Sequence, residues 1–363
     1  MKTIKAGPRQ VLCANPDSPF FYFGWPSVAR LQDGTLAMAA SGYRLEHICP
    51  FGKGVIAYSQ DDGETWTRPA AVIDTPLDDR DSGIVPFGNG RAIFTSFNNT
   101  TRFQRKTNAP RHRDPSPQVR AKARLIDAYL DYVESLGDPD CCVGSTYCLS
   151  EDGGYTFGPV YFSPVTAPHG PSLMKDGTLL YLGIPKAPVF ATGEDLDDGV
   201  YCFVSTDRGE TFSLRSKIEI DPAFRPCEAY GIELSDGTIV GTVRTGDLHT
   251  LVFRSTDGGF GWTEAKELTY GAPAHLIETP GGLLVCTYSK RKDGTGQCIR
   301  VSRDGGANWS GETYISSPAD PTDGDLGYPA TAAYPDGSFI TVYYQRWGKD
   351  KKTSLVRTLW RFK

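Results

Sequence analysis

The sequence predicts an all-β protein, a six-bladed β-propeller that forms one domain over residues 1–363 and carries one helical insertion in its second blade. Two independent repeats predict this fold. A hairpin pattern occurs six times, and a Ser-x-Asp-x-Gly motif that ends in an aromatic residue occurs five times. The last three motif copies start 50 and 47 residues apart. Regular repeats of this kind are typical of propellers, in which each repeat is a four-stranded blade.

The composition fits a folded protein without a bulk affinity for polyanions. Hydrophobic residues make up 39% and charged residues 22% of the chain, which excludes a disordered or fibrous protein. The formal net charge is -5, so no overall positive field attracts nucleic acid or an anionic membrane. We expect any anion to be bound locally, and we predict neither a nucleic-acid nor a membrane partner. The sequence does not indicate the oligomeric state.

The amino terminus and the cysteines predict a reduced, cytoplasmic protein. The first 20 residues contain no apolar run typical of a secretion signal, and no later segment is apolar enough to span a membrane. The nine cysteines show no paired metal-binding spacing. A chain trimmed of its signal would look the same, and such a protein would be secreted or periplasmic.

The hairpin repeat supplies the first two strands of each expected blade. In each copy an apolar strand, a turn of the Asp-Gly kind and a second apolar strand follow one another. The six copies are residues 28–40, 84–96, 171–183, 231–243, 275–287 and 331–343.

The aromatic-terminated motif marks a later turn of the blade. Its aspartate can accept backbone N–H bonds, its glycine adopts a conformation costly for other residues, and its aromatic ring packs under the sheet. Each copy follows a hairpin where the turn between the third and fourth strands should fall. The copies are Ser59–Trp66, Ser150–Phe157, Ser205–Phe212, Ser255–Trp262 and Ser302–Trp309. The sixth blade lacks a copy, so we expect residues 353–363 and an amino-terminal strand to complete it and close the ring.

The first two motif copies start 91 residues apart, which indicates an insertion over residues 98–145. Apolar residues at helical spacing predict a helix that ends near Gly137. They are Val119, Ala123, Ile126, Tyr129, Leu130 and Val133. The basic run between Arg102 and Arg113 is interpreted as a solvated loop. The helix is either a packed decoration or a lid on the active-site face.

Strand order predicts where a binding site lies. The tight turns mark one face of the ring, and the first strand of each blade begins at the opposite face, where propellers form pockets at the mouth of the central channel. The residues eight positions before each hairpin turn should therefore surround this mouth. They are Trp25, Asp81, Pro168, Glu228, Pro273 and Tyr328.

Cationic side chains gather on the same face in this mapping. Those at the ends of the second strands are Arg44, Lys186, Arg244, Arg291 and Arg346, and the face also receives His47, Lys53, His169 and His275. This set predicts a site for a carboxylate, sulfate or phosphate, because an arginine fork matches an oxyanion. The alternative is that each arginine pairs with a neighbouring Asp or Glu.

Two segments resemble the sialidase (neuraminidase) superfamily, whose Asp-box is similar to the aromatic-terminated motif. CEAYGIELSDGTIVGTVR resembles the segment in which a glutamate opens one strand and a carboxylate-binding arginine ends the next, which implies Glu228 and Arg244. GYPATAAYPDGSFITVYY resembles the segment that begins with the nucleophilic tyrosine, which implies Tyr328. The loop after residue 288 implies Arg291 as another carboxylate-binding arginine.

The chain departs from that family at two places. The family's Phe/Tyr-Arg-Ile-Pro motif reads Phe23-Gly24-Trp25-Pro26 here, so its arginine is missing. The family's acidic residue is also absent from the next loop, which leaves His47 or Asp81 as the acid. Trp25 is a candidate for stacking on a sugar ring.

The leading hypothesis is a glycoside hydrolase that acts on terminal acidic sugars. Tyr328 would be the nucleophile, Glu228 would take its proton, and Arg44, Arg244 and Arg291 would bind the anion. His169, His275, Lys53 and Arg346 are further candidates for substrate contacts. Two alternatives stay open: a polysaccharide lyase on uronate glycans, and a propeller that binds glycans without catalysis. No feature of the sequence predicts a metal or another cofactor.

Overall fold

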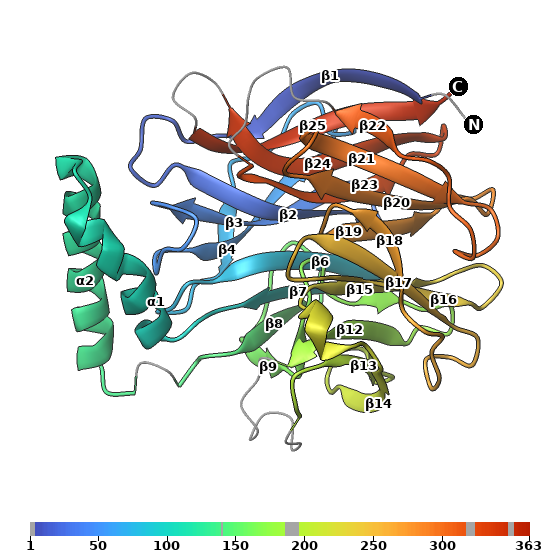
Figure 1. Cartoon of the computed structure of the whole chain (residues 1–363), viewed down its shortest axis with the longest axis horizontal. Coiled ribbons are helices and arrows are strands. Elements are labelled where there is room, and N and C mark those ends of the chain that lie inside the picture. Colours follow the sequence, from blue (N-terminus) through green and yellow to red (C-terminus); the bar gives the residue numbers. More distant parts are fainter. Residues whose placement is uncertain (1–3, 139–140, 186–195, 317–323, 348–351) are drawn as a thin grey trace.

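The computed structural model describes residues 4–138, 141–185, 196–316, 324–347 and 352–363, and it shows a six-bladed β-propeller (Figure 1). Five blades are four-stranded antiparallel sheets. In the third blade two short segments, β10 and β11, both pair with β12 in place of a single first strand. The predicted fold class and blade number are confirmed.

Each blade of the first half of the ring follows one hairpin repeat of the sequence. Blade 1 contains β2 (Tyr22–Arg30), β3 (Leu36–Arg44), β4 (Lys53–Ser59) and β5 (Ala70–Ile73). Blade 2 contains β6 (Arg80–Gly88), β7 (Arg91–Phe97), β8 (Ser145–Ser150) and β9 (Tyr161–Ser163). Blade 3 contains β10 (Val165–Thr166), β11 (Ser172–Leu173), β12 (Leu179–Pro185), β13 (Val200–Ser205) and β14 (Ser213–Ile218).

The second half of the ring has the same organisation, preceded by a short 3-10 helix, η2 (Pro222–Phe224). Blade 4 contains β15 (Ala229–Glu233), β16 (Ile239–Arg244), β17 (His249–Ser255) and β18 (Lys266–Tyr270). Blade 5 contains β19 (Ala274–Glu278), β20 (Leu284–Lys290), β21 (Gly296–Ser302) and β22 (Thr313–Ser316). Blade 6 contains β23 (Leu326–Ala333), β24 (Ser338–Trp347), β25 (Lys352–Phe362) and β1 (Ile4–Cys13).

The amino-terminal strand closes the ring as predicted. β1 pairs antiparallel with β25, with Val11 opposite Val356. Arg357 of β25 also donates to Gln10 in β1 and to Glu64 in blade 1. Blade 6 is thus built from both ends of the chain, which closes the ring and covers the edge of β25.

The five Ser-x-Asp-x-Gly motifs form one repeated turn. In every copy the serine hydroxyl donates to the aspartate at 2.8 Å. The same hydroxyl accepts a hydrogen bond from the N–H of the glycine that ends the Ser-x-Asp-x-Gly motif, at 2.8 to 2.9 Å. In the first copy, bonds from Thr65 and Ser59 lower the pKa of Asp61 to about 2. The motif therefore stabilises a turn and leaves its carboxylate ionised.

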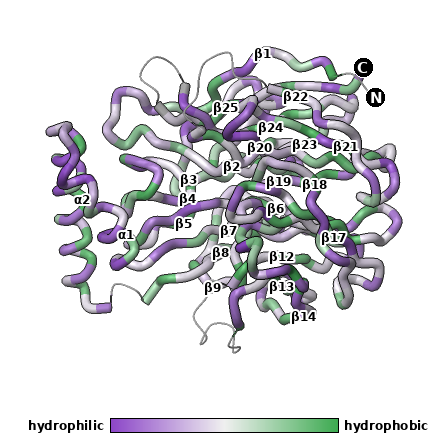
Figure 2. The backbone as a smooth tube through the Cα atoms, in the orientation of Figure 1, coloured by the Kyte–Doolittle hydropathy of each residue, from purple (hydrophilic) through white to green (hydrophobic). Residues whose placement is uncertain are grey.

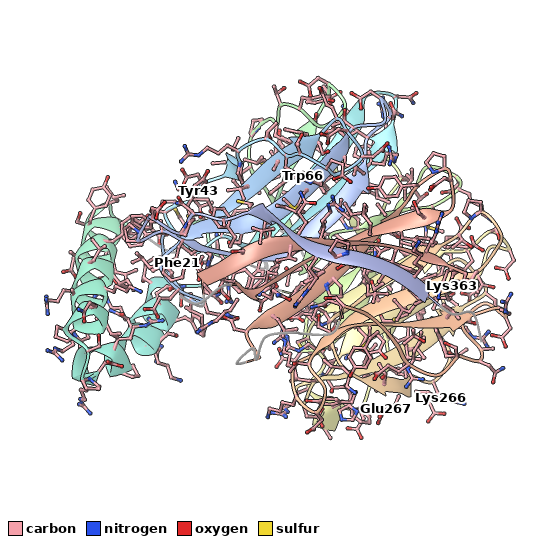
Figure 3. The ribbon with its side chains drawn as sticks, turned by 90° about the horizontal axis from the view of Figure 1, so that it is seen from above. Phe21, Tyr43, Trp66, Lys266, Glu267 and Lys363 are labelled. Carbon is pink, nitrogen blue, oxygen red and sulfur yellow. The ribbon has the colours of Figure 1, made fainter. Side chains whose placement is uncertain are left out.

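The insertion folds into α1 (Thr101–Asn108), the 3-10 helix η1 (Ala109–Arg113) and α2 (Pro117–Ser135). The predicted helix is present, and Ala123, Ile126, Leu130 and Val133 form its buried face. Figures 1 and 3 show the helices beyond one end of the ring, with Lys363 at the opposite end. Hydrophobic and hydrophilic residues alternate along α2 (Figure 2). Neither this helix nor any other in the described ranges is long and apolar enough to cross a membrane.

The basic run 102–113 is helical, which corrects the interpretation as a solvated loop. Thr100 caps α1 by accepting the N–H of Phe103. Gln104 donates to Asp78 of blade 2, and Asn108 donates to the Ala123 carbonyl of α2. The buried face of α1 is therefore polar, and the apolar spacing that indicates a helix is absent from its sequence.

Candidate functional site

Three blades place an unusual backbone conformation at the predicted mouth position. Trp25, Asp81 and Tyr328 have φ values of 53°, 51° and 55°, in the left-handed region that side chains disfavour. Each lies at a register shift in the first strand of its blade. Such an irregularity turns a side chain out of the regular alternation of a strand. The conformation recurs at equivalent positions of blades 1, 2 and 6, where it aims these side chains at one region.

Tyr328 and Glu228 meet across the ring. The Tyr328 hydroxyl donates to Glu228 Oε1 at 2.5 Å, although 100 residues separate them. Arg244 Nη1 donates to both oxygens of Glu228, at 2.8 and 2.9 Å. Burial, followed by the charges of Glu228 and Asp81, raises the pKa of Tyr328 well above its ordinary value. The site therefore holds a neutral phenol that is hydrogen-bonded to the Glu228 carboxyl group.

Arg291 lies beside Tyr328, and two of its nitrogen atoms have no hydrogen-bond partner among the described residues. Its guanidinium carbon is 5.7 Å from the centre of the Tyr328 ring. Nε and Nη2 are buried and have no hydrogen-bond partner among the described residues. A Cβ added at Gly327 would lie 3.0 Å from Nη2, so a glycine there leaves room for the guanidinium. Buried N–H donors without partners are costly, and an anion would satisfy them.

Asp81 faces the same centre from blade 2. Together with Glu228 it lines a cavity of about 130 Å³, whose other walls are Phe97, Thr166, Ala167, Pro168, Ile184 and Cys227. Burial and the nearby charge of Glu228 raise the pKa of Asp81 to about 7. A carboxyl in this range can hold a proton near neutral pH and donate it.

His47 lies at the rim of the site. Its Nδ1 is 2.8 Å from the Tyr22 hydroxyl and 3.2 Å from Asp325 Oδ1, and its ring meets Trp25 edge-on at 4.9 Å. The His47 side chain is 46% exposed. Burial opposes ionisation of Asp325, but hydrogen bonds from His47 and Tyr22 hold the pKa of its carboxyl below its usual range.

The expectation that Arg44 contacts the anion is corrected. Its side chain is 0% exposed and forms an ion pair with Asp78 at 2.6 Å. It also donates to Ser41 and to the backbone carbonyls of Asp79 and His47. A Cβ at Gly52 would come within 1.9 Å of Arg44 Nη1, so the chain closes directly over the guanidinium. Arg44 supports the loop that carries His47.

Trp25 also differs from the expected sugar platform. Its side chain is 2% exposed, because the rings of Tyr22, His47 and Tyr344 surround it. Its edge-on contact with the Tyr328 ring, at 6.4 Å between centroids, makes it a wall behind the tyrosine.

Two further predicted cations form ion pairs. Lys53, at the start of the third strand of blade 1, bonds to Asp74, and its predicted contact with substrate stays a prediction. Arg346 Nε lies 3.5 Å from Asp325 Oδ2 and so belongs to the His47 group at the rim. Lys186 lies outside the described residues.

The histidines that begin blades 3 and 5 line a cavity, and their predicted substrate contacts stay predictions. His169 and His275 are buried one and two residues beyond the mouth position, with their rings 4.8 Å apart. They line a channel cavity of about 480 Å³ that runs among the inner strands. Burial lowers the pKa of His275 to about 3, so this histidine stays neutral. Neither ring reaches the Tyr328 cluster through any contact in the described part of the chain.

Sequence reasoning missed three residues of the site: Tyr22, Arg80 and Asp325. Tyr22 and Asp325 bond to His47 and to each other. The Arg80 guanidinium lies over the rings of Trp25 and Phe97. Asp325 and Arg80 lie three and one residues before the counted positions Tyr328 and Asp81, which is the signal that could have found them. No group of three or more metal-ligating side chains is suitably arranged among the described residues.

Comparison with known proteins places the fold. No family model and no curated protein matches the chain. A protein of unknown function from Dyadobacter fermentans superposes with a TM-score of 0.77, at 19% identity over 99% of both chains. An intramolecular trans-sialidase from Ruminococcus gnavus, solved with oseltamivir carboxylate, gives 0.65 at 13% identity over 97% of this chain and 96% of its own.

A Trypanosoma rangeli sialidase, solved as a covalent intermediate with 2,3-difluorosialic acid, gives a TM-score of 0.60. It is 15% identical, and the match covers 93% of this chain and 54% of that one. Identities this low establish the architecture alone. The chain therefore has the six-bladed β-propeller fold of the sialidases.

Proposed function

We propose that this protein is a glycoside hydrolase that removes terminal acidic sugars through a covalent bond to Tyr328. The observation that carries the proposal is the hydrogen bond of 2.5 Å from the Tyr328 hydroxyl to Glu228, set beside the unpartnered guanidinium of Arg291. A nucleophile with its base and an anion receptor thus share one site.

The tyrosine suits an anionic sugar for an electrostatic reason. A carboxylate nucleophile would repel a substrate carboxylate next to the anomeric carbon, whereas a neutral phenol does not. Glu228 accepts the phenol proton as the oxygen attacks, and Arg244 holds Glu228 in position through both carboxylate oxygens. The attack forms a bond from the Tyr328 oxygen to the anomeric carbon and breaks the bond to the leaving oxygen.

Asp81 is the proposed proton donor to that leaving oxygen. Its pKa of about 7 keeps the carboxyl protonated in mildly acidic solution. Water then hydrolyses the tyrosyl–sugar bond and restores the phenol. His47, at the rim and bonded to Asp325, is proposed to contact the leaving group.

The anion is proposed to bind at Arg291 and the free edge of Arg244. Arg291 Nε and Nη2 and Arg244 Nε are all buried without hydrogen-bond partners in the described ranges. Each charge-assisted hydrogen bond to an anion is worth about 1.5–3 kcal/mol. The propeller fold of the chain, shared with a sialidase solved with a sialic acid derivative, supports this assignment.

The test is hydrolysis of a panel of aryl glycosides of sialic and uronic acids, with neutral hexosides as reference. We expect at least one acidic glycoside to be cleaved. Tyr328→Phe should lower kcat by about a hundredfold or more and change KM only a few-fold. Tyr334→Phe is the matched control, because Tyr334 lies in the same blade and bonds to the Asp62 carbonyl at the opposite face.

Two outcomes would contradict the proposal. Release of an unsaturated uronate from a 4-linked uronate oligosaccharide, detected by the ultraviolet absorbance of its new double bond, would indicate elimination, and therefore a lyase. Binding of acidic sugars without any turnover, unchanged in Tyr328→Phe, would indicate a binding protein instead.

A further inference from the structure

Arg80 holds its guanidinium between two aromatic rings at the start of β6. The guanidinium carbon is 5.5 Å from the centre of the Trp25 ring and 5.1 Å from that of the Phe97 ring. Its side chain is 13% exposed. Aromatic rings hold the planar group in one orientation and leave its edge, which carries the N–H donors, available.

The donors of Arg80 are not used within the described part of the chain. Its one charged contact is Asp78, whose Oδ2 lies 3.7 Å from Nε, beyond hydrogen-bond distance. Asp78 already forms an ion pair with Arg44 at 2.6 Å and accepts a hydrogen bond from Gln104 at 2.9 Å. Arg80 Nε is buried with no hydrogen-bond partner among the described residues. No close salt bridge among the described residues therefore explains why a charged arginine is buried at this position.

The backbone explains how Arg80 and Asp81 both serve one centre. Neighbouring residues of a regular strand point to opposite faces. Asp81 has a left-handed φ of 51°, and the pairing with β7 shifts register between Arg80 and Gly83. The Arg80 side chain accordingly contacts Trp25, which backs Tyr328, while Asp81 shares a cavity wall with Glu228.

Position 24, next to Trp25 in blade 1, holds a glycine and so supplies no cation. A Cβ added at Gly24 would lie 3.2 Å from Tyr22 Cε1 and 3.7 Å from the Tyr344 ring. The two tyrosine rings thus occupy the space that a longer side chain at position 24 would need.

We propose that Arg80 is a third anion-binding guanidinium, delivered by the second blade, which completes the site formed by Arg244 and Arg291. The inference rests on the proposed function and names the ligand class more closely: a sugar whose oxyanion, a carboxylate or a sulfate ester, is large enough to span forks from blades 2, 4 and 5. Arg80 keeps its charge in this buried place, because burial lowers its pKa but the neighbouring acidic groups, Asp78 first, raise it by more.

Binding measured by isothermal titration tests the inference without requiring turnover. The probes are N-acetylneuraminic acid, glucuronic acid and galactose 6-sulfate, with galactose as the neutral reference. Arg80→Met should weaken the best anionic probe at least tenfold, and Arg80→Lys should recover only part of the affinity, because an ammonium lacks the planar fork. Arg91→Met is the control for lost charge, because Arg91 pairs with Glu151 and Glu210 at the turn face.

Rescue separates a binding role from a packing role. Arg80→Ala leaves a slot between Trp25 and Phe97, and millimolar methylguanidinium should restore anionic-sugar affinity to this variant but not to Arg291→Met. If Arg80→Met does not fold, Arg80→Lys and this rescue still decide the question.

The outcomes distinguish the two proposals. Loss of affinity in Arg291→Met with wild-type affinity in Arg80→Met and Arg80→Lys would overturn the role of Arg80 and leave the proposed function standing. Failure of all three acidic probes to bind the wild-type protein would overturn both. A preference for the sulfated probe over the carboxylates would identify the oxyanion as a sulfate ester.

Discussion

Tyr328 and Glu228 belong to different blades, so their hydrogen bond depends on the positions of both blades in the ring. The bond pairs a phenol whose pKa is raised with a carboxylate that Arg244 keeps in place. A raised pKa makes spontaneous ionisation of Tyr328 rarer, so the proton must leave during attack. Glu228 is the group in hydrogen-bond contact that can accept it.

Asp81 should make the rate of the reaction depend on pH. Burial and the charge of Glu228 raise its pKa to about 7, so the carboxyl is protonated below that pH and loses its proton above it. We expect kcat/KM to fall as the pH rises through about 7. Asp81→Asn should remove this alkaline limb and lower turnover of alkyl glycosides about 10²–10⁴-fold, with a smaller loss for 4-nitrophenyl glycosides. The check is a pH profile from 5 to 9 with both substrates.

His47→Gln is the comparison for that experiment. It keeps a polar side chain at the rim and should retain the alkaline limb. If His47→Gln loses the limb while Asp81→Asn keeps it, the proton donor is His47 and the assignment of Asp81 is wrong.

Counting from the hairpin turns finds some site residues and misses others for a clear reason. Tyr328 and Asp81 are found because equivalent strand positions of every blade face the channel. Arg80 is missed because alternation places it opposite Asp81, and the left-handed backbone at Asp81 overrides alternation. The burial of Arg44 depends on Gly52 and Asp78, distant partners that local spacing does not reveal.

At the scale of elements, the inserted helices brace the rim loop of blade 1. Ile126 and Leu130 of α2 pack with Leu45 and Cys49, whose loop carries His47. Arg111 of η1 adds an ion pair to Glu46. The insertion therefore contacts the loop that carries His47. Through this loop it can affect the position of His47 at the rim of the site.

Leu130→Ala tests this brace. Leu130 is 0% exposed, so its truncation should cost about 2–5 kcal/mol, concentrated in the insertion. Leu125→Ala, the same change on the exposed side of the same helix at 46% exposure, should cost less than about 0.5 kcal/mol. Hydrogen exchange of residues 44–53 and 101–135 measures both. Equal protection in the two variants would show that α2 does not hold the rim.

The helix prediction succeeded for α2 and failed for α1 for a physical reason. α2 buries an apolar stripe with the helical period, whereas α1 buries Thr101, Gln104 and Asn108, which bond to their surroundings. A helix whose inner face is polar has no hydrophobic signature, so its basic outer residues looked like a loop.

At the scale of the whole molecule, closure by β1 keeps the six blades in register around the site. Deletion of residues 1–13 would leave β25 as an open edge and remove the Gln10 contact of Arg357. We expect the thermal midpoint to fall by about 5 °C or more and the protein to self-associate. Differential scanning calorimetry and light scattering measure these effects. An unchanged midpoint in a monomeric deletion variant would show that closure is dispensable.

The repeats made the architecture predictable because each blade carries its own local signals, a hairpin turn and an Asp motif. The site was predictable only where it follows that repetition. Its remaining contacts join Tyr22 to Asp325 and Arg80 to Trp25 between different blades, and such contacts have no period in the sequence.

Trapping of the covalent intermediate shows whether the Tyr328 oxygen forms the bond to the sugar. The protein is incubated with the fluorinated analogue of whichever acidic glycoside it cleaves, and intact mass and peptide mapping are recorded. We expect a mass increase of one fluorosugar, located on the peptide that contains Tyr328 and absent in Tyr328→Phe. A label on any other residue, or inactivation of Tyr328→Phe at the wild-type rate, would contradict it.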